Sequence, residues 1–183
     1  MDAATNESVE LTLFSSLLDL DEFEVVHVSQ DRARHVRTLT IVPKAVVGMC
    51  PHCHGITEQR HLCRERAVLD LPMGRWRTEL SVKIWQFHCS VCDHFFTPAF
   101  AALAQGAHAT ERLLERLEKL VRQSDLSSAA RFLDIAEKTA EGWYYQYCQR
   151  KQQRAPAAAM KPIRSLGIDE LSLKKDTGNT AAC

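Results

Sequence analysis

The first 30 residues contain no lysine or arginine, and the chain has no apolar run of membrane-spanning length. The same 30 residues hold seven acidic side chains, the wrong sign for a signal peptide. These absences predict a soluble protein of the cytoplasm that does not enter a membrane. The 183-residue chain is formally neutral, but residues 31–164 carry 21 bases against 13 acids, a surplus of eight. Such a basic segment is compatible with nucleic acid without requiring it.

Cysteine is the residue type that organises the middle of the chain. Four of the seven cysteines form two Cys-x-x-Cys motifs, with 35 residues between Cys53 and Cys89. In a reducing compartment, metal binding explains such motifs better than disulfides do. Two motifs supply the tetrahedral set of ligands that Zn²⁺ prefers, with no position left open for chemistry. We therefore predict a structural zinc site formed by Cys50, Cys53, Cys89 and Cys92.

Histidines are frequent around both motifs. One of them could replace a cysteine as ligand, although four thiolates at regular spacing need no replacement. The histidines concerned are His52, His54, His61, His88 and His94. A redox role is not expected, because neither motif opens a helix behind a βα unit.

The stretch between the motifs predicts two strands, His61–Leu71 and Thr78–Cys89, joined by turn residues up to Gly74. With the motifs at their tips, they would form a zinc ribbon over residues 46–100. A unit of this size buries little core, so we expect the metal to supply folding free energy. The ribbon is basic, which fits either a solvated face or contact with DNA phosphate. Its basic residues are Arg60, Arg64, Arg66, Arg75, Arg77 and Lys83.

Residues 1–45 are predicted to form a leading segment. Leu11–Leu20 carries an apolar stripe with helical spacing, and two β-rich runs follow at 23–29 and 37–42. A polar stretch separates the two runs, so a hairpin is the simplest arrangement.

From Thr110 the apolar period becomes 3.6, with Thr110 as the expected N-cap of a first helix. A second helix is predicted from Ser127 to Leu133 and a third from Glu137 to Arg154. This spacing over residues 108–154 favours a helix-turn-helix, with a plain three-helix bundle as the alternative. Asp134 stands where such turns need a left-handed backbone, which aspartate tolerates.

In a helix-turn-helix, the third helix would be the recognition helix in the major groove. Its outward face is predicted to carry Lys138, Thr139, Glu141, Gly142, Tyr145 and Gln146, of which the N-terminal members would reach base edges. Its far end would contact phosphates through Arg150, Lys151 and Arg154. Trp143, Tyr144 and Tyr147 are predicted to lie in the core.

Residues 155–162 have the composition of a linker, and the following run predicts a strand with Asp169 in its middle. The order of parts resembles bacterial insertion-sequence transposases of the ISL-three family, from about residue 11 to 175. The matching motifs are Leu17-Leu-Asp-Leu20, Cys50-Pro-His-Cys53, Cys89-x-x-Cys92, Ala129-Ala-Arg-Phe-Leu133 and Gly167-Ile-Asp169-Glu170.

The resemblance implies an N-terminal zinc ribbon, a helix-turn-helix that binds the terminal repeats of the element, and a ribonuclease-H-like DDE domain. Asp169 would then be the first catalytic carboxylate. Strand transfer in such a domain uses two divalent metals, such as Mg²⁺, held by further carboxylates. The sequence offers no second carboxylate strand before Cys183. The resemblance therefore predicts a C-terminally truncated transposase that binds double-stranded DNA but is inactive in strand transfer on its own.

The predicted fold class is thus α+β and multidomain, with residues 155–183 holding the linker and the first strand of the truncated DDE domain. The predicted function is recognition of terminal repeats during transposition, in the cytoplasm at the nucleoid. Self-association is compatible with this function, although the sequence locates no interface. Three alternatives stay open: a stand-alone DNA-binding regulator, a zinc-ribbon module that binds protein or RNA, and an active enzyme completed by a partner chain.

Overall fold

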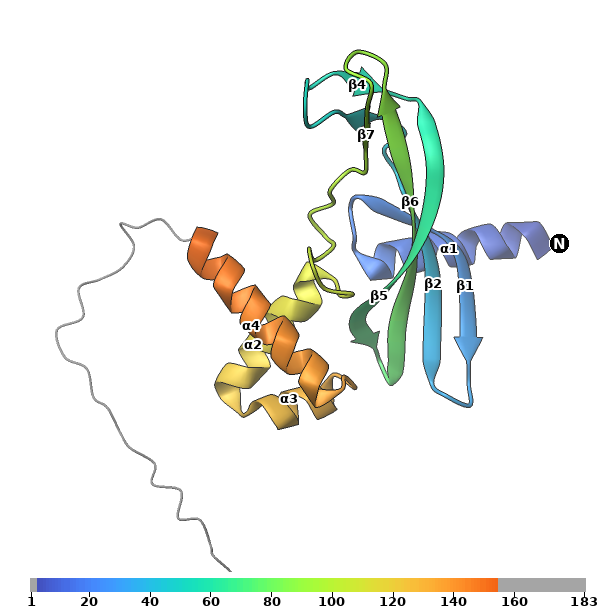
Figure 1. Ribbon diagram of the computed structural model, residues 1–183. Helices are drawn as coiled ribbons and strands as arrows, with labels where there is room; N and C mark the ends of the chain where they lie inside the picture. Colours follow the sequence, from blue (N-terminus) through green and yellow to red (C-terminus); the bar gives the residue numbers. More distant parts are fainter. Residues whose placement is uncertain (1–2, 155–183) are drawn as a thin grey trace, which may run out of the picture.

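The computed structural model describes residues 3–154, which form a mixed α and β structure (Figure 1). The predicted linker and the strand with Asp169 lie outside these residues. In chain order the elements are α1 (Ala3–Leu18), β1 (Phe23–Asp31), β2 (Val36–Pro43), β3 (Gly48–Met49), β4 (Ile56–Thr57), β5 (Arg60–Met73), β6 (Trp76–Cys89), β7 (His94–Phe96), α2 (Glu111–Gln123), α3 (Leu126–Phe132) and α4 (Glu137–Arg154). None of the helices in this part of the chain combines the length and apolar character that crossing a bilayer requires.

One five-stranded sheet occupies the N-terminal two thirds of the described residues. Its strand order is β1-β2-β6-β5, and β7 adds to the distal part of β6. The predicted β1–β2 hairpin is present, but β2 also pairs in parallel with β6, from Val36 opposite Arg77 to Ile41 opposite Val82. The sheet therefore runs across the predicted division between residues 1–45 and 46–100.

The hairpin of β5 and β6 is the longest part of this sheet, and each of its strands has 14 residues. Its two halves have different surroundings. The half near the β5–β6 turn pairs with β2 and contributes Val68, Leu80 and Val82 to an aliphatic core under α1. The other half extends beyond β2 and carries the short strands and both cysteine motifs (Figure 1). Only this outer half has the small core expected for the ribbon.

Helix α1 begins at Ala3, earlier than the predicted Leu11, and covers one face of the sheet (Figure 1). Leu18 is buried in the aliphatic core, and Phe14 packs against that core. The opposite side of α1 leaves Leu13 and Leu17 exposed. Apolar residues occur on more than one face of α1, but only one face contacts the sheet, so the others stay exposed.

The three helices α2, α3 and α4 pack together beside β5 (Figure 1). The segment before α2 adds to the edge of β5: the Leu69 amide donates to the His108 carbonyl, and the Thr110 amide donates to the Leu69 carbonyl. A buried carboxylate fixes the junction, because Asp70 accepts hydrogen bonds from Thr110 Oγ1 (2.7 Å) and Arg112 Nε (2.8 Å). The three helices are therefore attached to the sheet by backbone pairing and by an ion pair.

The predicted helix ends agree closely with the structure. Thr110 caps α2 by accepting from the Leu113 amide, and α4 spans the predicted residues. Helix α3 begins at Leu126, one residue before the predicted Ser127, because the Asp125 side chain caps it. Asp125, which lies between the first two predicted helices, is thus the start signal of α3.

Candidate functional sites

Both Cys-x-x-Cys motifs lie at the outer end of the β5–β6 hairpin. Cys50 and Cys53 belong to the turn between β3 and β4, while Cys89 ends β6. In each motif the residue after the second cysteine has a left-handed backbone, with φ of 59° at His54 and 54° at Asp93. The two motifs are therefore built alike, as two tight turns that face each other across the end of the sheet.

The four cysteine sulfurs converge, and all lie within 4.8 Å of one another. The Sγ atoms of Cys50 and Cys92 are 3.6 Å apart, and those of Cys53 and Cys89 are 3.5 Å apart. A tetrahedral site with Zn–S bonds of about 2.3 Å has S–S edges of about 3.8 Å. The cluster could hold a metal ion, and its donors and spacing are compatible with structural Zn²⁺.

The electrostatics of the cluster also favour a cation. A hydrogen bond from the Cys92 amide lowers the pKa of the Cys89 thiol to about 7, although burial opposes this effect. Burial, together with the neighbouring thiols of Cys53 and Cys50, raises the pKa of Cys92 to about 12. Thiolates this close disfavour each other's charge, so the four cannot all ionise by themselves. A divalent cation among them would remove this conflict.

The surrounding histidines point to other partners. The ring nitrogens of His88 contact Asp93 at 2.7 Å and Gln59 at 3.2 Å. The rings of His52 and His94 stack on each other. Within residues 3–154, the group of possible metal ligands consists of the four cysteines alone. The structure therefore brings no histidine into the predicted ligand set.

The three-helix unit, residues 108–154, has the turn geometry that its sequence predicts. Asp134, between α3 and α4, has φ of 53°. The small residues Ala130 and Ala140 are buried where the helices meet, and Leu133 and Ile135 point into the core on either side of the turn. The predicted core aromatics Trp143, Tyr144 and Tyr147 are partly buried against the same cluster.

All six residues predicted for the outward face of α4 are exposed: Lys138, Thr139, Glu141, Gly142, Tyr145 and Gln146. At 3.6 residues per turn, Lys138, Gly142 and Tyr145 follow the stripe farthest from the buried Ala140. Gln149 is exposed on the same stripe and is not among the predicted residues, although its spacing from Lys138 could have indicated it.

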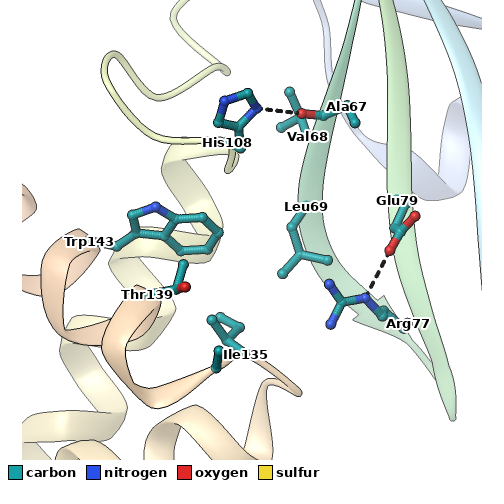
Figure 2. A pocket seen from close by; sticks show the side chains of 10 residues that line it. Ala67, Val68, Leu69, Arg77, Glu79, His108, Ile135, Thr139 and Trp143 are labelled. Carbon is teal, nitrogen blue, oxygen red and sulfur yellow. Dashed lines mark hydrogen bonds and ion pairs between the residues drawn. The ribbon is translucent and has the colours of Figure 1, made fainter.

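Thr139 lies at the edge of this face rather than at its centre. Together with Trp143 it points toward β5, across a cavity of about 420 Å³ that Leu69 and Arg77 also line (Figure 2). Gln146 lies on the same edge, near Gly106 in the segment before α2. The sheet therefore borders α4 along one side and leaves the opposite side open.

The basic residues predicted to contact phosphates have different surroundings. Arg150 donates to the Gln105 carbonyl (3.1 Å) and to Glu111 (3.0 Å), and Lys151 pairs with the buried Glu118 at 3.1 Å. Arg154 is exposed and has no ion pair with any other residue in 3–154. Arg150 and Lys151 therefore join α4 to neighbouring acids, a role that their sequence positions alone do not reveal.

The basic residues predicted for the ribbon also divide by environment. Arg66 donates to the carbonyls of Ala104 and Ala107, and Arg60 lies over the Trp85 ring. Arg77 pairs with Glu79 at 3.0 Å. The remaining members are exposed and form no ion pair within the described residues: Arg64, Arg75 and Lys83.

Comparison with known proteins gives one informative relative. The chain is 30% identical over 145 residues to the transposase for insertion sequence element IS1001 from Bordetella parapertussis. The aligned part covers 76% of this chain and 34% of the relative, so the chain spans about a third of that transposase. No protein-family model matches the chain, and no solved structure matches it.

Proposed function

We propose that this chain is the DNA-binding part of an insertion-element transposase and that it recognises the terminal repeats of its element. The observation that carries the proposal is the similarity to a transposase over 145 residues, which include most of the described structure. The arrangement of α3 and α4 around a left-handed Asp134 supports a helix-turn-helix. An α+β protein with a zinc ribbon and a helix-turn-helix is the architecture we propose.

In this proposal α4 is the recognition helix. A recognition helix contacts base edges through its N-terminal residues. The exposed stripe of α4 begins with Lys138 and continues through Gly142 and Tyr145, while Trp143 and Tyr147 hold the opposite side in the core. Beyond its own turns of helix backbone, a Cβ added at Gly142 would meet no described atom within 4 Å, so the backbone is open to a close approach there. Arg154, exposed and without an ion pair to any residue in 3–154, suits a phosphate contact at the far end of α4.

The zinc in this proposal is structural. Four thiolates fill a tetrahedral coordination sphere, and no position remains for water or substrate. Its role is to fold the outer end of the β5–β6 hairpin, where Cys50 and Cys89 are buried together with Phe87 and Phe96.

Catalysis remains a separate proposal. Asp169 lies outside the described residues, and we propose it as the first carboxylate of a DDE site with Mg²⁺ as its metal. One carboxylate cannot hold two metals, so a DDE site would need further carboxylates beside Asp169. Asp169→Ala should then leave DNA affinity unchanged.

The proposal is tested by selecting duplexes from a random library with the zinc-loaded full chain. The selected sequence should match the element's terminal repeat and give a selective mobility shift. Lys138→Ala should reduce selectivity by about 1–3 kcal/mol per lost base contact. Lys119→Ala is the matched control, because Lys119 is exposed on α2 and paired with Glu115. Selection of unrelated sequences would overturn the proposal.

One observation favours a second function, binding of another protein at the zinc end. Met49, Ile56 and Val91 are 64%, 75% and 75% exposed beside the cysteine cluster, an unusual position for large apolar side chains. This alternative, or a role in RNA binding, gains support if Lys138→Ala and Tyr145→Ala leave duplex DNA affinity unchanged.

A further inference from the structure

The parallel pairing of β2 and β6 brings two turns together at the end of the sheet that lies away from the cysteine cluster. This end is called the inner end. The register places Val36 opposite Arg77, so the β1–β2 turn lies next to the β5–β6 turn. The Arg77 amide donates to the His35 carbonyl at 3.0 Å, and the His35 and Trp76 rings are 5.7 Å apart. These contacts fix the two turns relative to each other.

Three arginines project from the two turns. Arg32, Arg34 and Arg75 are all exposed, and none forms an ion pair with a residue in the described range 3–154. The Asp31 carboxylate accepts from the Ala33 and Arg34 amides, at 3.0 and 3.1 Å, and so holds the backbone of the β1–β2 turn. The three arginines, named here the turn arginines, therefore bring three exposed positive charges onto two adjoining turns, with the Asp31 carboxylate at the start of the turn that holds Arg32 and Arg34.

The turn arginines lie beside the start of the proposed recognition helix. Arg77 donates to the Asp134 carbonyl and lies 3.4 Å from the Asp134 carboxylate, which attaches the β5–β6 turn to the turn before α4. A cavity of about 390 Å³ separates the same elements and is lined by Arg34, Arg75 and the exposed Phe132. Figure 2 shows Arg77 on the strand side of the space that faces Thr139.

This placement has a consequence for bound DNA. If the N-terminal residues of α4 reach base edges in the major groove, the groups beside that end of the helix face the flanking backbone. Arginine suits this position, because its planar guanidinium binds phosphate oxygens with two parallel hydrogen bonds and keeps its charge at any physiological pH. Of the acids nearby, Glu79 and Asp134 pair with Arg77, and the Asp31 carboxylate accepts two backbone hydrogen bonds of its own turn.

We propose that the turn arginines form a second DNA-contact surface, which binds the phosphates that flank the groove occupied by α4. The inference rests on the proposed function for the role of α4. It adds that the sheet is part of the DNA-binding surface and that its inner end, opposite to the zinc, makes the contact.

The test uses the zinc-loaded full chain and compares Arg32→Ala/Arg34→Ala/Arg75→Ala with a matched triple variant, Lys44→Ala/Arg64→Ala/Lys83→Ala. Both remove three exposed positive charges from the same sheet, but the second set lies away from the two turns. Circular dichroism checks that both variants fold. The readouts are the slope of log affinity against log salt and hydroxyl-radical footprints on the selected duplex.

Loss of three phosphate contacts should make the slope of log affinity against log salt shallower by about 2.7. Near 0.15 M salt this corresponds to about a hundredfold loss of affinity. The footprint should shorten on one flank, while the preference for the selected sequence over a scrambled duplex stays the same. The matched triple variant should change the slope by less than about 0.9, the change expected for one phosphate contact. Arg→Lys at all three turn positions should restore most of the slope, since the charge is retained.

Equal slopes and equal footprints for the two triple variants would overturn the inference. The proposed function fails separately, if the parent chain shows no sequence preference. In that case the salt slopes on any duplex still decide whether the turn arginines contact DNA. Absence of all duplex binding by the parent chain would overturn both.

Discussion

At its outer end the β5–β6 hairpin is held by a cluster of four buried residues, two of them cysteines. At its inner end the same two strands contribute to a core of eleven buried residues and dock against three helices. The outer end buries little apolar surface, so in the proposed function its order depends on a metal held by the four cysteines. The inner end has an ordinary core. A single hairpin thus joins a region that we propose is folded by metal coordination to a region folded by hydrophobic burial. Four substitutions, in order of expected effect, test this contrast and the helices that pack beside it.

Cys89→Ser should have the largest effect. Metal binding contributes about 10–16 kcal/mol of apparent free energy in small structural zinc sites, and the variant loses one of four ligands. We expect loss of bound zinc and rapid amide exchange at residues 48–57 and 85–96, with exchange in α2 to α4 unchanged. Zinc content and hydrogen–deuterium exchange measure this. Cys63→Ser is the control, since Cys63 is exposed on β5 and outside the cluster. Loss of protection in the helices as well would show that the two ends unfold together.

Leu80→Ala should destabilise the inner end by about 4 kcal/mol, because Leu80 is 1% exposed and its removal leaves a cavity. Chemical denaturation at saturating zinc measures the change in free energy of unfolding. Leu62→Ala on the neighbouring strand should change it little, since Leu62 is 46% exposed. Loss of bound zinc from Leu80→Ala under conditions where it stays folded would contradict the separation of the two ends.

Asp70→Ala should lower the free energy of unfolding by about 3 kcal/mol, near the lower limit for breaking a buried ion pair. The lower limit applies because the Arg112 side chain is 28% exposed, so water can solvate its charge when Asp70 is removed. The hydrogen bond with Asp70 raises the pKa of the Arg112 guanidinium. Arginine keeps its charge without such a partner, so the substitution leaves an unpaired cation at the junction. Thermal unfolding should show the three-helix unit separating from the sheet. Glu65→Ala, an exposed acid on the same strand, serves as the comparison. A single unshifted transition would show that the ion pair is not what holds the helices to the sheet.

Gly142→Ala should have the smallest effect, a stabilisation of about 1 kcal/mol from improved helix propensity. The new methyl group meets no atom within 4 Å. Gly74→Ala should act in the opposite direction, because φ at Gly74 is 66°. Denaturant midpoints measure both variants. A destabilised Gly142→Ala would mean that α4 is constrained at this residue in a way that the structure does not show.

Local signals in the sequence predict much of this molecule. The span of α4 and the cap at Thr110 are correct because periodicity and capping act within a few residues. The convergence of the four cysteines is predictable for a similar reason, since each Cys-x-x-Cys turn positions its own two sulfurs. Asp134 has the left-handed backbone that its place in the turn requires.

Contacts between distant segments are beyond the sequence. Nothing local indicates that β2 pairs with β6, so the sequence predicts the leading hairpin and the ribbon strands as separate units. The acids Glu111 and Glu118 approach Arg150 and Lys151 only because α2 packs against α4. The turn arginines likewise become one cluster only when the parallel register is known. In each case the missing information is the relative placement of elements and not their type.

The parallel register has a further consequence, for the order of folding. The β5–β6 hairpin joins residues that are close in sequence, while pairing of Val36 with Arg77 closes a loop of about 40 residues. Contacts between distant residues form late, because loop closure must precede them. We therefore expect the β1–β2 hairpin to keep an unpaired edge during synthesis until β6 has left the ribosome. In the cell, the interval between translation of residue 43 and of residue 82 is when this chain is most exposed to misassembly through that edge.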